Sequence, residues 1–171
     1  MTGDGRSAEA PRHRSAVRAL LMDPEDGAVL LMRSRFPGWK RARWITPGGG
    51  LDAGETPQAG LLREVFEETR LELGPEAIVG GPVWTRRVRY EWQGVHYDQH
   101  ERYFLLRVPR FEPDPHANPA AHETEALEAF GWWTATAMEA SGEQFIPRAL
   151  ARYLPPLHSG DLPRQPLDVG L

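Results

Sequence analysis

Three glutamates stand close together in one segment of the chain, and their spacing is the first indication of chemistry. Glu64, Glu67 and Glu68 occur in a stretch with the period of an amphipathic helix, about 100° per residue. At these spacings they share one helix face, with Cβ atoms about 5–6 Å apart, so the carboxylates repel one another. A divalent hard cation such as Mg²⁺ would offset the repulsion, because it takes oxygen ligands from carboxylates and substrate phosphates. The other interpretation is a solvated acidic face, relieved by Arg63 and Arg70.

A run of three glycines, Gly48 to Gly50, precedes this helix. Glycine adopts backbone angles barred to other residues and lets a carbonyl or amide approach a ligand without a Cβ in the way. The helix is expected from Thr56 to Leu71, with Thr56 as the N-cap and Pro57 at the first helical position. Its apolar arc, opposite the glutamates, is expected to be buried and consists of Ala59, Leu61, Leu62, Val65 and Phe66.

The residue types in this region follow the order G-x5-E-x7-R-E-x-x-E-E. The segment reads GGLDAGETPQAGLLREVFEETRL from Gly49 to Leu71 and is preceded by WITPG. With this motif the sequence resembles the Nudix hydrolase family. One position departs from the family pattern, because Arg70 stands where the family has a glycine that caps the helix in the left-handed conformation. Either Arg70 adopts that conformation at a cost of about 1 kcal/mol, or the helix continues.

The resemblance implies an enzyme that hydrolyses a nucleoside diphosphate linked to another moiety, cutting a pyrophosphate bond with Mg²⁺ or Mn²⁺. It implies that Glu64, Glu67 and Glu68 bind the metal and supply the catalytic base, with the main-chain carbonyl of Gly49 as a further ligand. Metal ions neutralise phosphoryl oxygens and lower the pKa of a bound water, and a glutamate then takes the proton. The sequence leaves open which glutamate is the base.

The same resemblance gives Glu55 and Arg63 a structural role, as a pair that ties the loop to the helix. The implied fold is a Nudix-type α/β/α sandwich with a mixed β-sheet. The implied substrate is a small molecule derived from a nucleotide, and dimers are common in the family, so a homodimer is compatible with it. Two alternatives stay open: a non-catalytic Nudix-like domain that binds a nucleotide metabolite, and an isomerase built on the same fold.

Several charged residues outside the motif are candidates for completing the site. Guanidinium groups suit phosphate, and arginines that follow the preceding strand or lie on the strand after the motif are Arg33, Arg35, Arg86, Arg87 and Arg89. Each of them is equally a candidate for simple surface solvation. Acidic residues that would add a metal or substrate contact from a later segment are Glu101, Glu123 and Glu125.

Alternating residues near the second half of the chain raise the question of a zinc site. His96, Asp98 and His100 fall on one face of an expected strand, and imidazole and carboxylate groups bind zinc. No fourth ligand is evident, so a polar strand face is the favoured interpretation.

The composition narrows the class of protein. The chain has 171 residues, no cysteine and a formal charge of -4, which excludes disulfides and thiolate metal sites and argues against general binding to nucleic acid or anionic membranes. No apolar run is long enough to span a bilayer or to form a secretory signal, so a cytoplasmic location is expected.

The elements that position the motif follow from hydrophobic periodicity and turn residues. We expect one domain over residues 15–154, with tails over residues 1–14 and 155–171. The expected strands are Ser15 to Met22, Ala28 to Met32, Val83 to Trp92, Val95 to Val108 and Ala129 to Trp133, with a tight turn at Gln93-Gly94 and a loop from Phe111 to Ala121. Short helices are expected from about Ala135 and over Pro147 to Tyr153.

Overall fold

The computed structural model describes residues 10–114 and 126–170. The candidates Glu123 and Glu125, much of the expected loop and most of the expected N-terminal tail lie outside the described residues. The strands are β1 Arg12–Met22, β2 Val29–Arg35, β3 Arg43–Ile45, β4 Trp84–Trp92, β5 Val95–Arg107, β6 Ala126–Trp133, β7 Phe145–Ile146 and β8 Leu167–Asp168. The helices are α1 Pro57–Thr69, α3 Ala135–Ala140 and α4 Leu150–His158, with a 3-10 turn, η1, at Pro75–Ala77.

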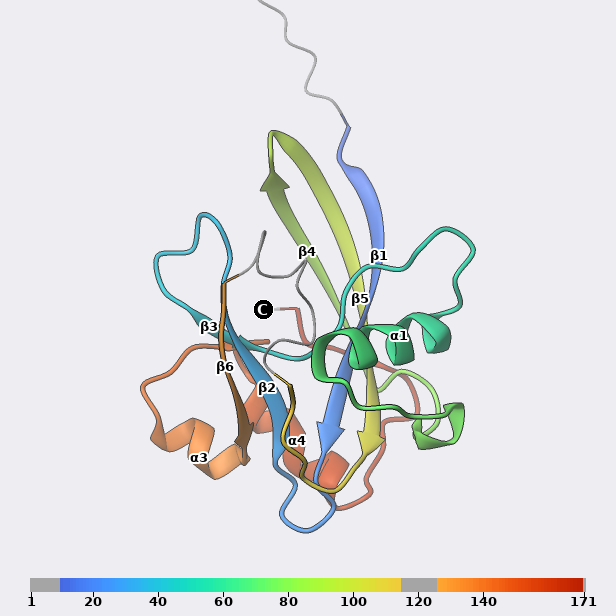
Figure 1. The fold of residues 1–171 in the computed structure, drawn as a ribbon, viewed down its shortest axis with the longest axis vertical. Helices are drawn as coiled ribbons and strands as arrows, with labels where there is room; N and C mark the ends of the chain where they lie inside the picture. The colour runs from blue at the N-terminus through green and yellow to red at the C-terminus, as the bar shows by residue number, and fades with distance from the viewer. Residues whose placement is uncertain (1–9, 115–125, 171) are drawn as a thin grey trace, which may run out of the picture.

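The strands form one mixed sheet that splays into two halves (Figure 1). One half contains β7, β3, β2 and β6, and the other contains β1, β5, β4 and β8. The halves meet where β1 and β2 pair antiparallel at Met22 and Val29. Farther along β1, the glycine loop (residues 47–51) takes the place of β2: the amide of Val17 donates to the carbonyl of Gly49 at 2.9 Å. The splay therefore brings the glycines against the edge of a central strand.

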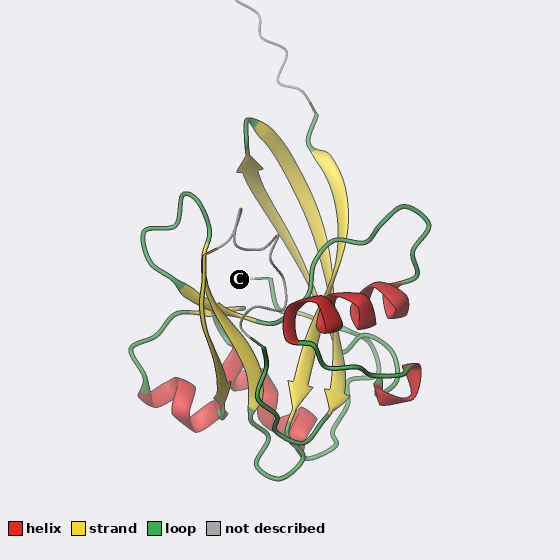
Figure 2. Ribbon diagram, viewed as in Figure 1, coloured by secondary structure: helices red, strands yellow, loops and turns green. Residues whose placement is uncertain are grey.

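Helices cover the two faces of the sheet (Figure 2). On one face, Leu61 and Val65 of α1 pack with residues of β1, β2 and β5. On the other face, Leu150, Leu154 and Leu157 of α4 pack into a second buried cluster. The alternation of apolar residues along β1 feeds both clusters, because successive strand residues point to opposite faces. The α/β/α sandwich with a mixed sheet is thus confirmed.

Most of the expected elements are present. The hairpin of β4 and β5 turns at Gln93 and Gly94, whose φ angles of 49° and 77° are those of the tight turn expected there. Within the described ranges, no helix is long and apolar enough to cross a membrane.

The C-terminal segment differs from the expected tail. The helix α4 runs through Pro155 and Pro156 to His158, because Leu157 is buried in the core. Beyond it, β8 pairs in parallel with β4, and Val169 is 3% exposed. At the other end, β1 begins at Arg12, inside the expected N-terminal tail. Prolines lower the local preference for helix, but the burial of apolar side chains keeps this segment helical and packed on the core.

The buried face of α1 is rotated relative to the prediction. Leu61 and Val65 are buried as expected, but Ala59 and Phe66 are exposed, and Gly60 and Thr69 are buried instead. The reason is the glycine loop, which packs on the glutamate side of the helix: a Cβ on Gly60 would lie 2.4 Å from the side chain of Leu51. Glu64 and Glu68 of the acidic face are therefore turned toward the glycine loop.

Candidate active site

The two ends of α1 are set by local interactions. At the start, the hydroxyl oxygen of Thr56 accepts a hydrogen bond from the amide of Ala59 at 3.2 Å, as expected for an N-cap. At the end, Arg70 has φ 62° and ψ 13°, and its amide donates to the carbonyl of Phe66 at 2.9 Å. Of the two outcomes expected for Arg70, the structure therefore shows the left-handed cap, and the motif helix ends at Thr69.

The glycines before the helix are required by close contacts. Gly48 has φ 133°, and a Cβ there would lie 2.1 Å from the carbonyl oxygen of Val17. A Cβ on Gly49 would lie 2.6 Å from a carboxylate oxygen of Glu64. Glycine thus lets the main chain pass between the β1 edge and the first of the three glutamates.

A matched pair of alanine variants tests this account. Gly48→Ala should destabilise the fold by roughly 3 kcal/mol or more, because it adds both backbone strain and a clash with main-chain atoms. Gly54→Ala should cost only about 1 kcal/mol, since Gly54 also has a positive φ but a Cβ there would meet no atom within 4 Å. Urea unfolding of both variants measures the difference, and equal losses would contradict it.

The three glutamates sit in different surroundings. The side chain of Glu64 is 13% exposed, and that of Glu67 is 44% exposed. Glu68 accepts a hydrogen bond from the amide of Gly48 at 2.7 Å. Burial raises the pKa of Glu64, and the charge of Glu67 acts in the same direction, while Arg63 opposes both. Glu64 and Glu68 thus contact the glycine loop, whereas Glu67 is the most exposed of the acidic residues that Arg63 binds on this helix.

Arg63 connects these carboxylates to the loop. Its guanidinium donates to both oxygens of Glu55, at 2.8 and 2.9 Å, and to the carbonyl of Gly50 at 3.1 Å. It also donates to Glu64 at 2.9 Å and to Glu67 at 3.1 Å. The hydrogen bond from Arg63 lowers the pKa of Glu55 to about 2, with help from the amide of Asp52. Arg63 thus links Glu55 and the main chain of the glycine loop to α1, and the structural role of the Glu55–Arg63 pair stays a prediction.

A second arginine reaches the loop from β1. Arg18 donates to the carbonyl of Gly48 at 2.8 Å and to Glu101 at 2.9 and 3.0 Å. Glu101, on β5, is 2% exposed and also accepts from Arg86 and Tyr103. Burial alone would raise the pKa of Glu101, but the charges of Arg18 and Arg86 lower it to about 2. Both oxygens of this carboxylate are thus already engaged by protein donors.

Three of the five arginines predicted as candidates for phosphate contact, Arg33, Arg35 and Arg87, form ion pairs with other acidic residues. Arg33 and Arg35 both contact Glu128 on β6, at 2.5 and 3.3 Å. Arg87 donates to both oxygens of Asp98 on the neighbouring strand. The structure brings none of these pairs into the hydrogen-bonded network around the glutamates of α1, so far as the described residues show.

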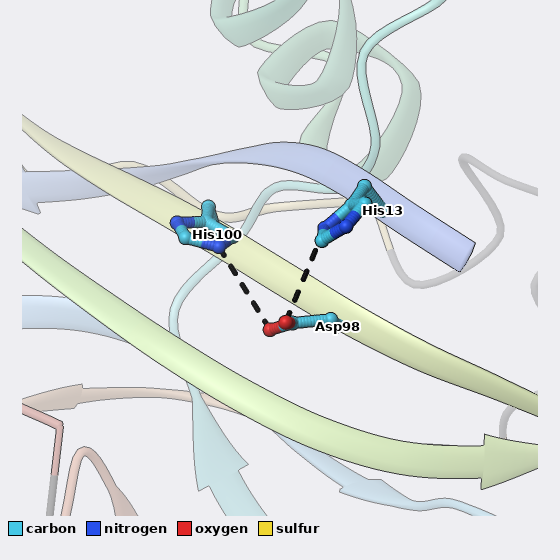
Figure 3. A group of neighbouring side chains, drawn as sticks. All are labelled: His13, Asp98 and His100. Carbon is cyan, nitrogen blue, oxygen red and sulfur yellow. Dashed lines mark ion pairs between the residues drawn. The ribbon is translucent and has the colours of Figure 1, made fainter. Parts of the chain in front are cut away.

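A residue of β1, His13, lies beside Asp98 and His100 of the predicted polar strand face. His13, Asp98 and His100 place their ligand atoms within 4.8 Å of one another (Figure 3). Asp98 is 1% exposed, whereas His13 and His100 are mostly exposed. Arg87 binds both Asp98 oxygens, which lowers the pKa of Asp98, and Arg89 lies 3.6 Å away. A cation there would have to displace one guanidinium and sit beside another, so the polar strand face remains the better interpretation.

Two arginines near the loop were missed by sequence reasoning. The guanidinium of Arg14 packs on Gly50, where an added Cβ would lie 2.5 Å from it. Arg14 also donates a hydrogen bond to the hydroxyl of Tyr90. Among the described residues, no carboxylate oxygen forms a salt bridge with Arg14. The sequence did contain a pattern that could have identified them, because strand alternation places Arg14 and Arg18 on one face of β1. Arg14, however, fell inside the expected N-terminal tail.

The donor set around the glycine loop fits a hard divalent cation. Glu64, Glu67 and Glu68 supply carboxylate oxygens, and the loop supplies carbonyl oxygens. The carbonyl of Gly49 accepts from the amide of Val17 and keeps a second lone pair. The main chain at Gly49 lies directly against the Glu64 carboxylate, where any side chain would intrude. All of these are oxygen ligands of the kind that Mg²⁺ and Mn²⁺ take.

Comparison with known proteins supports this interpretation of the motif. Residues 12–153 match the NUDIX domain. The chain is 26% identical to Nudix hydrolase 25 of Arabidopsis thaliana over 132 residues, which cover 72% of this chain and 73% of that protein. It is 40% identical over 60 residues to the diphosphoinositol polyphosphate phosphohydrolase 3-beta of Bos taurus, covering 35% of this chain and 34% of that protein.

The fold is also found among solved structures. The E. coli dihydroneopterin triphosphate pyrophosphohydrolase superposes with a TM-score of 0.59 at 17% sequence identity, covering 82% of this chain and 94% of that one. At this level of identity, the similarity speaks for the shared fold alone. The match to the NUDIX domain over most of the chain, with the glutamates of the motif intact, leads to one conclusion. The chain belongs to the NUDIX family and is a Nudix hydrolase, an enzyme that acts on phosphorus-containing acid anhydrides.

Proposed function

We propose that this enzyme is a divalent-metal-dependent pyrophosphohydrolase that cleaves a nucleoside diphosphate linked to another moiety. The observation that carries the proposal is the packing of the glycine loop on the acidic face of α1: Gly49 against Glu64, and the amide of Gly48 on Glu68. An acidic helix face used only for solvation would not need a tight main-chain contact on its carboxylates.

Glu64, Glu67, Glu68 and the carbonyl of Gly49 are the residues that would hold Mg²⁺ or Mn²⁺. When bound, the cation neutralises phosphoryl oxygens and makes a water acidic enough to attack near neutral pH. One of the three glutamates would then serve as the base that accepts a proton from the attacking water. Arg63 keeps Glu64 and Glu67 in place from one side, through its hydrogen bonds to both carboxylates.

A polyanionic substrate also needs cations from the protein. Arg14 is suited to this, because it lies over Gly50 and, among the described residues, has no carboxylate partner. The arginines Arg18, Arg63 and Arg86 are instead each bound to a glutamate. Guanidinium groups match phosphate geometry, so Arg14 supports the choice of a substrate that carries linked phosphates. The base, sugar and leaving group are not distinguished by these contacts.

A hydrolysis screen tests the proposal. The purified protein is incubated with Mg²⁺ or Mn²⁺ and a panel of nucleoside triphosphates, diphosphates, sugar nucleotides and dinucleoside polyphosphates, and products are identified by mass. We expect at least one compound to be cut at a pyrophosphate bond, and the reaction to stop with EDTA and resume with added metal. Tight binding of a nucleotide without cleavage would instead favour a binding domain and contradict the proposal.

A further inference from the structure

Arg18 and Glu101 form a buried ion pair that reaches the glycine loop. We propose that Arg18, held by Glu101, is a positioning residue that fixes the main chain at Gly48 beside the carboxylates of α1. The inference rests on the proposed function for what the loop is positioned to do, but the positioning itself is a property of the loop and can be measured without any reaction.

Gly48 is held from both sides. Its amide donates to Glu68 of α1 at 2.7 Å, and its carbonyl accepts from Arg18 of β1 at 2.8 Å. Gly48 has φ 133° and no side chain to pack, so its own conformational preference does little to fix it. The contact with Arg18 therefore restrains the peptide that leads directly into Gly49, the residue packed on Glu64.

Arg18 can restrain the loop because its own guanidinium is held in place by Glu101. Two of its nitrogens, Nε and Nη2, donate to the same oxygen of Glu101, which leaves Nη1 directed to Gly48. The side chain of Arg18 is 18% exposed and that of Glu101 is 1% exposed. A planar guanidinium donates in fixed directions, so holding two nitrogens sets the position of the third.

Glu101 is in turn held from three other directions. One of its oxygens accepts from Gln99 at 2.9 Å, and the other accepts from Arg86 at 2.9 Å and Tyr103 at 3.0 Å. A carboxylate with this many donors does not rotate freely, and the pair with Arg18 links β5 to β1 and then to the loop. Supporting partners of this kind orient the groups that contact a metal, and their loss typically weakens metal binding about tenfold to a hundredfold.

Arg86 offers a matched control. It donates to the same carboxylate at a similar distance, and its side chain has the same exposed fraction of 18%. None of its hydrogen bonds within the described part of the chain reaches the glycine loop. Lysine at either position keeps the positive charge next to Glu101 but has a single nitrogen in place of the fork, so it cannot hold the carboxylate and a second acceptor in the same geometry.

The test compares Arg18→Lys with Arg86→Lys. Amide exchange at Gly48, followed by NMR without metal, should be faster by about tenfold in Arg18→Lys and within twofold of wild type in Arg86→Lys. Mn²⁺ binding followed by EPR should weaken about tenfold in Arg18→Lys alone. If a lysine variant does not fold, Arg18→Met and Arg86→Met replace the pair, because each leaves Glu101 with one arginine.

The outcomes separate the two proposals. Equal effects of the two substitutions, or unchanged exchange at Gly48 in Arg18→Lys, would overturn the positioning role. If wild type takes up no Mn²⁺ and cuts no nucleotide, the proposed function fails, and the exchange comparison still decides whether Arg18 holds the loop.

Discussion

Glu68→Gln should reduce the rate of metal-dependent hydrolysis by a hundredfold or more, and Glu67→Gln should reduce it by nearly as much, while both variants stay folded. The glutamine oxygen at position 68 can still accept the hydrogen bond from the amide of Gly48, so the contact that the structure shows is retained. What is lost is the negative charge, which is the property that a divalent cation requires of its ligand. Phosphate release with Mn²⁺ and the midpoint of thermal unfolding measure the two parts of the prediction.

The matched control is Glu72→Gln. Glu72 is an exposed acidic residue just after the end of α1, and its removal changes the net charge by the same amount. Its hydrolysis rate should stay within twofold of wild type. Wild-type rates in Glu67→Gln and Glu68→Gln would show that the acidic face is not used for catalysis, and the assignment of these glutamates would have to be abandoned.

Glu101→Gln should lower the free energy of unfolding by about 3–5 kcal/mol at neutral pH. Glu101 is almost completely buried, and the substitution leaves the guanidinium groups of Arg18 and Arg86 without their counter-charge. Breaking a buried pair from one side is costly because the remaining charge stays away from water. Urea unfolding at pH 7 gives the value directly.

The pH dependence of this loss has a defined sign. Burial opposes ionisation of Glu101, but Arg18 and Arg86 lower its pKa from 4.5 to about 2 in the folded protein. The ionised group therefore stabilises the fold above about pH 4.5, and this contribution declines as the pH falls toward 2. The difference in stability between wild type and Glu101→Gln should narrow over that range. A difference that stays constant from pH 5 to pH 2 would contradict the ionised pair.

Glu128→Gln provides the comparison. Glu128 also contacts two arginines, Arg33 and Arg35, but its side chain is 28% exposed and theirs are 35% and 54% exposed. Exposed pairs are screened by water and typically contribute no more than about 1 kcal/mol. The loss in Glu128→Gln should be correspondingly small, and a loss as large as that of Glu101→Gln would mean that burial is not the cause.

The sequence was sufficient for features that depend on near neighbours in the chain. Thr56 caps α1 three residues ahead of its partner amide, Gln93 and Gly94 close a hairpin, and the three glutamates share a helix face because they are three and four residues apart. Such interactions depend on backbone geometry that repeats within one or two turns, so residue type and spacing predict them. The Nudix motif is local in the same sense, and the family resemblance that it shows was sufficient to predict the fold.

Only the tertiary structure decided which charges meet. Arg18 and Glu101 are 83 residues apart in the sequence. They pair because β1 and β5 lie side by side in parallel with Val17 opposite Arg102, so that Arg18 and Glu101 come close across the two strands. The same register pairs Asp98 with His13, and the packing of the glycine loop places it against Glu64 and Glu68 of α1. Residue type states that a side chain is charged, but partner and burial depend on strand register and on packing between distant segments, which no local pattern encodes.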